Sequence, residues 1–240
     1  MTATPSSTER VPVAGRAREL ATTKRRGRTT PRQQRSLERL WPRYGVEVAA
    51  EGEPWRLDRR ALFGREAPVV LEVGFGMGEA TVAMAAADPG RDVLAVDLHV
   101  PGAGALLHEL DARGLANVRV LQADARRVLR EGLAPGSLDE VRAFFPDPWP
   151  KARHRKRRLV DPAFAALVAD RLAVGGRLHV ATDWVPYAEQ VVEVLAAEPR
   201  LEVLPGRDRP AHRPLTRFER QGLAKGHVVT DVVAVQVRAE

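Results

Sequence analysis

A glycine-rich turn between an apolar run and an alanine-rich stretch limits the possible folds of this chain more than any other feature. Residues 69–73 have the length and composition of a buried strand, and residues 79–87 are predicted to form a helix. Between them, Gly74, Gly76 and Gly78 alternate with bulkier residues. Glycine permits positive φ and lets the backbone approach a ligand closely. A strand, a glycine turn and a helix in this order are typical of the first unit of a parallel βαβ sheet.

Short apolar runs continue to alternate with helical segments after this turn. Strands are predicted at residues 93–97, 118–121, 139–145, 176–181, 201–204 and 227–237, and helices at residues 102–113, 124–130, 162–172 and 186–197. No helix is predicted between the last two strands, so these should pair antiparallel. The pattern predicts an α/β, Rossmann-like fold with a doubly wound, mostly parallel seven-stranded sheet and an antiparallel C-terminal edge.

The helix after the glycine turn begins with Glu79, which limits the kind of ligand that the turn can hold. The dinucleotide-binding fingerprint requires glycine at this position, and a carboxylate at a helix N-terminus opposes a pyrophosphate group. A nicotinamide-dependent dehydrogenase is therefore disfavoured. The turn suits a nucleoside ligand without phosphates, of which S-adenosylmethionine is the common example.

Three acidic residues stand at or near the ends of successive predicted strands. Asp97 ends the second strand, where a carboxylate can accept hydrogen bonds from both ribose hydroxyls. Glu72 precedes the first glycine and can face the ammonium group of a methionine moiety, and Asp124 follows the third strand and can contact the adenine amino group. Each acid alone could instead cap a helix. Together they line one crevice of the sheet, which favours the interpretation as a ligand site.

The positive charge of the chain is concentrated at its N-terminus. The 240 residues contain 38 Lys and Arg against 31 Asp and Glu, a formal net charge of +7. Residues 1–36 hold nine basic and two acidic side chains and show no apolar periodicity. We predict a disordered basic arm over residues 1–36 and a single domain over residues 37–240. The arm either contacts nucleic acid or serves as a solubilising tail.

Several classes of site are excluded or disfavoured by missing residues. The chain has no cysteine, which excludes disulfides, thiol nucleophiles and cysteine zinc sites. Its six histidines show no pair at metal-binding spacing, so no metal is expected, and no GxSxG motif indicates a serine hydrolase. No apolar run approaches the roughly 18 residues that cross a bilayer, and the N-terminus lacks the apolar stretch of a secretory signal. We therefore expect a cytoplasmic protein without a membrane partner.

The end of the fourth predicted strand carries an acid between two prolines. The prolines fix the backbone around Asp147 at the mouth of the crevice, beside Trp149, where an aromatic ring can stack on a planar base. A Pro-rich turn without function is the alternative. Six of the next eight residues, Lys151 to Arg158, are basic. A solvated charge run is the alternative here, but beside the crevice such a patch would bind phosphates and steer a polyanion, which predicts a nucleic-acid substrate.

Four segments resemble one known family. They are LEVGFGMG at residues 71–78, FFPDPWPKARHRKRRLV at residues 144–160, ATDWVPYAE at residues 181–189 and TRFERQGLAKGHVVTD at residues 216–231. In order and approximate spacing they resemble the bacterial tRNA (guanine-N7)-methyltransferases of the TrmB type, and the PDPW-plus-basic segment is the most specific of them. The resemblance implies a class I methyltransferase fold, S-adenosylmethionine as cofactor, and methyl transfer to N7 of the guanine at position 46 in the tRNA variable loop.

The resemblance also implies roles for individual residues. Cofactor positions fall on Glu72, Gly74, Gly76, Gly78, Asp97, Asp124 and Asp147; substrate positions fall on Lys151, Asp183, Thr216, Arg217, Phe218 and Glu219; RNA-contacting positions fall on Arg153, His154, Arg155, Lys156, Arg157 and Arg158. From position alone, Asp183 could equally cap a helix, and Thr216 with Glu219 fits a capping box. The chain departs from the family at Asp97, where Glu is common, and at Pro150, where His often follows the Trp.

Guanine N7 carries a lone pair and no proton, so its methylation requires no strong general base. We expect Asp147 to be the catalytic residue, because it can orient the guanine through its N1–H and N2–H₂ edge and stabilise the cationic product. The expected partner is tRNA, bound by a monomer or homodimer. A related methyltransferase acting on another RNA or base atom, and an RNA-binding module without cofactor, are the alternatives.

Overall fold

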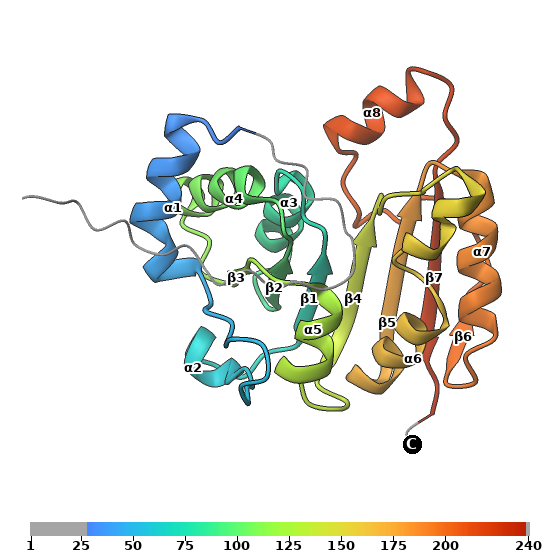
Figure 1. Ribbon diagram of the computed structural model, residues 1–240, viewed down its shortest axis with the longest axis horizontal. Coiled ribbons are helices and arrows are strands. Elements are labelled where there is room, and N and C mark those ends of the chain that lie inside the picture. Colours follow the sequence, from blue (N-terminus) through green and yellow to red (C-terminus); the bar gives the residue numbers. More distant parts are fainter. Residues whose placement is uncertain (1–27, 239–240) are drawn as a thin grey trace, which may run out of the picture.

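The computed structural model describes residues 28–238, which form one seven-stranded sheet (Figure 1). The strands are β1 (Val69–Val73), β2 (Asp92–Val96), β3 (Val118–Leu121), β4 (Leu138–Phe144), β5 (Leu172–Thr182), β6 (Leu201–Val203) and β7 (Thr230–Gln236). Their order is β3-β2-β1-β4-β5-β7-β6, with β1 to β5 parallel and β7 antiparallel to β5 and β6. The predicted doubly wound, mostly parallel sheet with an antiparallel C-terminal edge is confirmed.

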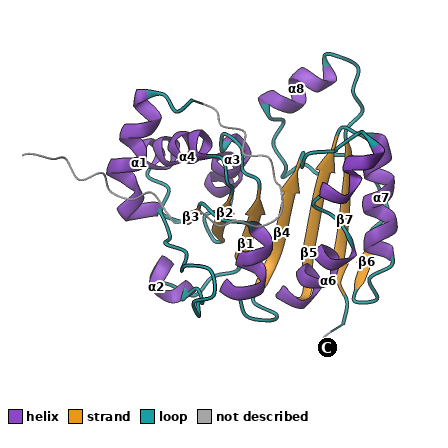
Figure 2. Ribbon diagram, viewed as in Figure 1, coloured by secondary structure: helices purple, strands orange, loops and turns teal. Residues whose placement is uncertain are grey.

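Helices cover both faces of the sheet (Figure 2). They are α1 (Pro31–Tyr44), α2 (Arg59–Phe63), α3 (Glu79–Ala87), α4 (Val100–Arg113), α5 (Ala125–Arg127), α6 (Pro162–Arg171), α7 (Val185–Ala196) and α8 (Arg217–Leu223), with the π-helical η1 (Val128–Gly132) and the 3₁₀-helical η2 (Ala152–Arg157). Within the described part of the chain, no helix has both the length and the apolar character needed to cross a membrane.

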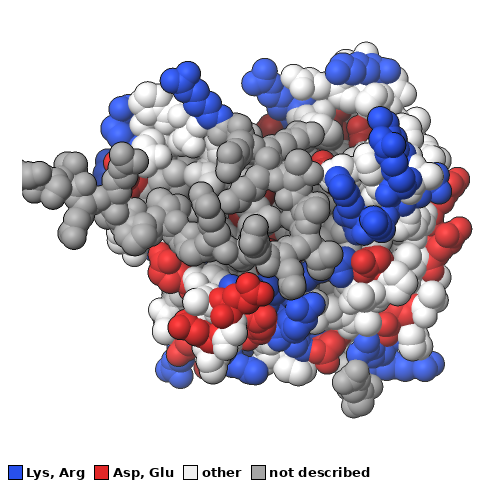
Figure 3. Space-filling model, viewed as in Figure 1, with Lys and Arg blue, Asp and Glu red and all other residues white. Residues whose placement is uncertain are grey.

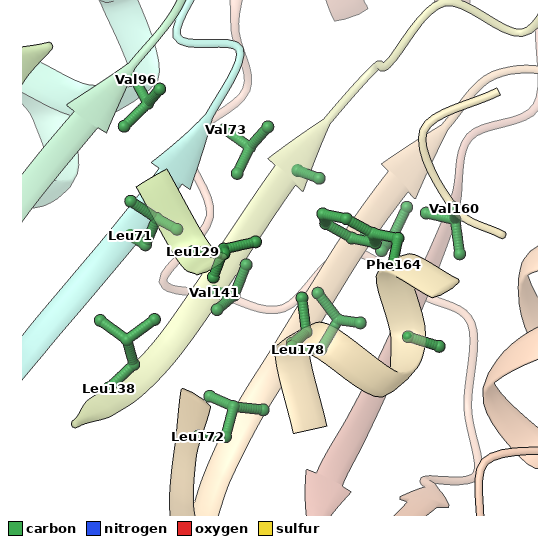
Figure 4. Close-up of a cluster of buried hydrophobic side chains, with 14 of the residues drawn as sticks. Leu71, Val73, Val96, Leu129, Leu138, Val141, Val160, Phe164, Leu172 and Leu178 are labelled. Carbon is green, nitrogen blue, oxygen red and sulfur yellow. The ribbon is translucent and has the colours of Figure 1, made fainter. Parts of the chain in front are cut away.

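The central strands are buried on both faces and supply two apolar cores. On β1, Val70 packs with residues of α1, α3 and α4, whereas Leu71 and Val73 pack on the opposite face with residues of η1, α6 and α7. Figure 4 shows this second core, in which Leu71, Leu129 and Phe164 meet between the sheet and the helices. A strand covered on both faces has a continuous apolar sequence, which is why residues 69–73 could be recognised as a buried strand.

Helix α1 corrects the predicted boundary of the N-terminal arm. Residues 1–27 lie outside the described residues, but residues 31–36, which were also assigned to the disordered arm, form the first turns of α1. Thr30 and Gln33 cap this helix reciprocally through side chain and backbone. The apolar contacts of α1 begin only at Leu37 and continue with Leu40 and Tyr44, so the sequence up to residue 36 carries no helical stripe.

Helix α8 contradicts the prediction that no helix separates the last two strands. It is seven residues long and begins at the N-cap Thr216. Its sequence, RFERQGL, contains too few apolar residues for a helical period to be visible. Two further corrections are that β5 begins at residue 172 rather than 176, and that the predicted helix 124–130 divides into α5 and η1. The other predicted boundaries agree with the structure to within three residues.

Candidate active site

The glycine turn lies at the carboxyl end of β1, where the strand order changes direction between β1 and its neighbour β4. The carboxyl ends of β1, β2, β3 and β4, called here the switch-point edge, are where ligands bind in sheets of this kind. Gly74, Gly76 and Gly78 have φ values of 79°, 57° and 82°. A Cβ atom on Gly102, in the first turn of α4, would lie 1.8 Å from the carbonyl oxygen of Gly76, so α4 packs directly on the turn.

Glu72 is a buried carboxylate with one free oxygen. Its side chain lies between the sheet and α3, where Oε1 accepts a 2.9 Å hydrogen bond from Thr81 Oγ1. Oε2 is buried and has no hydrogen-bond partner among the described residues. Burial raises the pKa of Glu72 to about 7, although Arg142 and the Thr81 bond act in the opposite direction. A buried acceptor without a partner is costly, so this position suits a cationic ligand group.

Asp97 and Asp124 follow the ends of β2 and β3, as predicted. The two oxygens of Asp97 each accept a 2.9 Å bond from a backbone N–H, one from Gly76 and one from His99, which fixes the carboxylate beside the glycine turn. Asp124 Oδ1 caps α5 through the N–H groups of Arg126 and Arg127, so the capping alternative is realised. Its Oδ2 makes no hydrogen bond among the described residues and is available to a ligand.

Asp147 lies in a strained and exposed turn after β4. Phe145 and Trp149, on either side of it, have φ values of 53° and 42°, which non-glycine residues rarely adopt. The Asp147 carboxylate is exposed and has no hydrogen bond or ion pair within residues 28–238. Because β1 and β4 are adjacent, the turn that carries Asp147 follows the strand next to the one that carries Glu72. Strain of this kind is typical of functional turns.

The basic run after this turn forms η2 and is mostly exposed. Lys151 is the N-cap of η2, and Figure 3 shows basic side chains gathered over this segment at the right of the view. The Arg157 guanidinium lies 5.0 Å from the centre of the Trp149 ring, so one face of this aromatic already has a partner within the protein. Partial desolvation and then the positive charges of Arg157 and Arg153 lower the pKa of His154.

Arg158 differs from the other residues of the basic run, and its contact with RNA stays a prediction. Its side chain is buried rather than exposed, and its Nε donates a 2.8 Å bond to the carbonyl oxygen of Pro148. The same guanidinium bonds Gln190 and lies 4.8 Å from the Tyr187 ring. Arg158 fixes the turn that carries Asp147 to helix α7.

Asp183, at the end of β5, pairs with a residue that the sequence did not single out. Its Oδ2 lies 2.8 Å from Nδ1 of His227, in the segment between α8 and β7. The alternative of a helix cap is not realised, because the N-cap of α7 is Trp184 and that helix has no side-chain cap. The pair ties the end of β5 to the segment that follows α8.

Glu219 is buried and serves a different purpose from the predicted substrate contact. Both of its oxygens accept hydrogen bonds from Arg213, at 2.6 and 2.9 Å, and this arginine also bonds both oxygens of Asp231 on β7. Asp231 accepts a further 2.6 Å bond from His179 on β5. Burial opposes ionisation of Asp231, but the bonds from His179 and Arg213 hold its pKa below the usual range. Glu219 is therefore an internal anchor of α8, and its contact with substrate stays a prediction.

The remaining residues of the TRFE element face outward. Thr216 caps α8 through a 3.2 Å bond from the N–H of Glu219, while Arg217 and Phe218 are exposed. The Phe218 ring lies 5.0 Å from the ring of Phe145, just before Asp147. Sequence patterns could not identify Arg213 or His227, because each is defined by partners that lie elsewhere in the chain.

One cluster could in principle hold a metal ion, which the histidine spacing did not predict. Ligand atoms of Glu140, His179 and His212 lie within 4.8 Å of one another. Arg91 and Arg142 already bond the Glu140 carboxylate, each at 2.6 Å. Two guanidinium groups satisfy this carboxylate and oppose a further cation, so the cluster gives no support for a metal centre.

Known proteins similar to this chain over most of its length are methyltransferases, in agreement with the family resemblance of the four sequence segments. A family model described as "Putative methyltransferase" matches residues 66–232. The tRNA (guanine-N(7)-)-methyltransferase of Streptomyces coelicolor is 53% identical over 218 residues, which cover 89% of this chain and 79% of that protein. The tRNA (guanine-N(7)-)-methyltransferase of Alkalilimnicola ehrlichii is 53% identical over 212 residues, covering 87% of this chain and 89% of that protein.

Solved structures share the fold at much lower sequence identity. The 16S rRNA methyltransferase KamB superimposes with a TM-score of 0.58 at 19% identity, covering 75% of this chain and 92% of that chain. The antibiotic-resistance methyltransferase Kmr gives a TM-score of 0.54 at 15% identity, with the same two coverages. The fold is that of the class I methyltransferases.

Proposed function

The chain belongs to the tRNA (guanine-N(7)-)-methyltransferase family, and on that premise we propose that it methylates N7 of guanine 46 in the tRNA variable loop. The family uses S-adenosylmethionine as methyl donor. The resemblance of the four sequence segments to this family is confirmed by relatives that cover most of the chain. The choice of guanine 46 follows from the family resemblance alone, and is the part of the proposal that most needs a measurement.

The observation that carries the proposal is the pairing of β1 with β4. It brings Glu72, a buried carboxylate with a free oxygen, and Asp147, an exposed carboxylate in a strained turn, to the ends of adjacent strands. The first suits a cation held within the fold, and the second suits a group that arrives from solvent. A methyltransferase requires both kinds of position next to each other, because donor and acceptor must meet in line.

The residues of the glycine-turn side fit S-adenosylmethionine, and we infer that they hold it. Glu72 Oε2 would accept from the ammonium group, Asp97 would accept from the ribose hydroxyls, and Asp124 Oδ2 would accept from the adenine amino group. Gly74 to Gly78 let the backbone lie close to the ligand. When bound, the cofactor supplies a methyl group on a positively charged sulfur.

Asp147 would orient the guanine and stabilise its product. The N7 lone pair attacks without loss of a proton, so no general base is needed. A carboxylate that accepts from the N1–H and N2–H₂ edge turns the opposite edge of the ring, with N7, toward the methyl donor. As N7 forms its bond to the methyl group, positive charge develops on the ring, and the negative charge of Asp147 stabilises it.

The exposed part of η2 would bind the phosphates of the tRNA. Arg153, Arg155, Lys156 and Arg157 are exposed directly after the Asp147 turn, so they can hold the backbone that carries the target base. Lys151, Asp183, Thr216, Arg217 and Phe218 are kept as proposed substrate residues. The proposal also includes a cytoplasmic location and a monomer or homodimer. It includes no metal, because attack by a lone pair needs no metal-activated water.

Methyl transfer from labelled S-adenosylmethionine to an unmodified tRNA transcript tests the proposal. The full-length chain is incubated with the transcript, and in parallel with a 16S rRNA transcript, before digestion to nucleosides. We expect N7-methylguanosine as the labelled product from tRNA and no label in rRNA. Label in another nucleoside, or label confined to rRNA, would favour the alternative of a methyltransferase with another target.

A further inference from the structure

Helix α8 is held in place by side chains from three other parts of the chain. Its inner side is fixed by the buried pair of Arg213 and Glu219. After its C-terminal end, His227 bonds Asp183 at the end of β5. The third contact comes from Glu79, the first residue of α3. The first two contacts belong to the substrate side of the site, whereas Glu79 directly follows the glycine turn.

The contact of Glu79 with α8 is made to the backbone as well as to a side chain. Its Oε2 accepts a 2.7 Å bond from the backbone N–H of Arg217, and its Oε1 lies 3.3 Å from the guanidinium of Arg220. N–H groups in the first turn of a helix have no partner within the helix. A carboxylate that accepts from one of them makes a charge-assisted bond and interacts favourably with the helix dipole. This contact therefore specifies the position of the first turn, which an exposed ion pair alone would not.

Helix α8 connects the two sides of the switch-point edge. On one side, the ring of Phe218 lies 5.0 Å from that of Phe145, next to the Asp147 turn. On the other side, its first N–H is bonded by Glu79, next to Gly78. Figure 1 shows α8 above the carboxyl ends of β4 and β5, on the side of the sheet edge where α3 begins.

We propose that Glu79 is a positioning residue for methyl transfer. Its contact with the first turn of α8, called the latch, fixes this helix across the switch-point edge and so holds Thr216 and Phe218 in position to contact the guanine. The inference rests on the proposed function and adds to it. Because Arg213 anchors the inner side of α8, loss of the Glu79 contact does not detach the helix. It only lets the first turn of α8 move away from α3. Loss of this charge-assisted bond is expected to lower the ratio of latched to unlatched α8 about 30-fold, for example from about 5:1 to about 1:6, so that the latched fraction falls and the unlatched fraction rises by about fivefold each.

Two substitutions of Glu79 separate this role from a general effect of charge. Glu79→Ala removes the acceptor for the Arg217 N–H, whereas Glu79→Gln keeps an acceptor oxygen and removes only the charge. The matched control is Glu109→Ala, which breaks an ion pair with Arg113 of similar exposure on α4. The measurements are amide hydrogen exchange of residues 217–223, the single-turnover rate of methyl transfer with both substrates saturating, and the thermal midpoint of unfolding.

We expect Glu79→Ala to speed exchange in residues 217–223 and to lower the single-turnover rate, each about fivefold, with an unchanged affinity for S-adenosylmethionine. Glu79→Gln should restore both values to within twofold of the unsubstituted chain, and Glu109→Ala should change neither. Unchanged exchange in Glu79→Ala, or equal loss of rate in the Ala and Gln variants, would overturn the latch. If the unsubstituted chain makes no N7-methylguanosine, the proposed function fails, and the exchange experiment still decides whether Glu79 holds α8.

Discussion

The two halves of the site are built in different ways. The proposed cofactor half, made of Glu72, residues 74–78, Asp97 and Asp124, is shaped mostly by backbone, because positive-φ glycines and backbone N–H groups determine it. The substrate half, made of Asp147, η2, Asp183 and α8, is held by side chains that meet from distant segments. A half held by side chains concentrates its stability in a few buried residues, so substitutions there should have the largest effects.

The largest effect is expected at Arg213. Its side chain is 1% exposed and bonds two carboxylates that are also buried. Arg213→Met removes the buried guanidinium that both carboxylates share and leaves Asp231 with His179 and Glu219 with the more exposed Arg209, which should lower the free energy of unfolding by about 3–5 kcal/mol. Arg39→Met, which breaks an exposed pair with Asp111, should change it by less than about 1 kcal/mol. Urea denaturation of both variants measures this, and similar losses in the two would contradict the contrast between buried and exposed pairs.

Asp147 should contribute to turnover and not to stability. Asp147→Asn keeps the shape of the side chain and removes its charge, so we expect the single-turnover rate to fall about 100-fold. The thermal midpoint and tRNA affinity should stay close to those of the unsubstituted chain, since Asp147 is exposed and has no partner within residues 28–238. The control is Asp88→Asn, an exposed acid at the far end of α3. Turnover unchanged by Asp147→Asn would remove this residue from the mechanism.

The difference between a half shaped by backbone and a half held by side chains also explains which parts of the site could be predicted from the sequence. The positions of the residues in the proposed cofactor half could be predicted, because a glycine pattern, strand ends and caps are visible in the sequence, and Asp97 lies beside the glycine turn. Their contacts with the cofactor stay predictions. For the substrate half, the family resemblance identified the segments but not their internal contacts. Glu219 and Arg158 were assigned to substrate and RNA, yet both are buried, Glu219 against Arg213 and Arg158 against Pro148 and Gln190, through side-chain contacts that no sequence pattern marks. Helix α8 was missed because it owes its position to such contacts.

Cofactor affinity should depend on pH through Glu72. Its pKa, raised to about 7 by burial, means that the carboxyl group is mostly neutral below pH 7 in the free protein. Binding of an ammonium group favours the charged form of Glu72, so affinity should rise about fourfold from pH 6 to pH 8, since the α-amino group of the ligand loses part of its own charge over the same interval. Calorimetry at the two pH values measures this. Glu72→Gln should bind more weakly at pH 8 and lose the dependence, and a dependence that persists in this variant would show another group to be responsible.

The smallest effect is expected from single charges of η2. Lys156→Glu should weaken tRNA binding several-fold and reduce the slope of log affinity against log salt by about one. Arg60→Glu on α2 makes the same change in net charge at an exposed position away from the switch-point edge, and should leave the slope unaltered. Equal slopes for both variants would mean that only total charge matters and that η2 has no specific role.

The most direct test of the account is to locate the methyl group on tRNA. Chemical cleavage at N7-methylguanine, applied after incubation with S-adenosylmethionine and an unmodified transcript, reads the modified position. The family resemblance, together with a base-orienting Asp147, predicts cleavage at guanine 46 alone, and none in a transcript with adenine at that position. Cleavage at other guanines, or methyl incorporation without any cleavage, would contradict it.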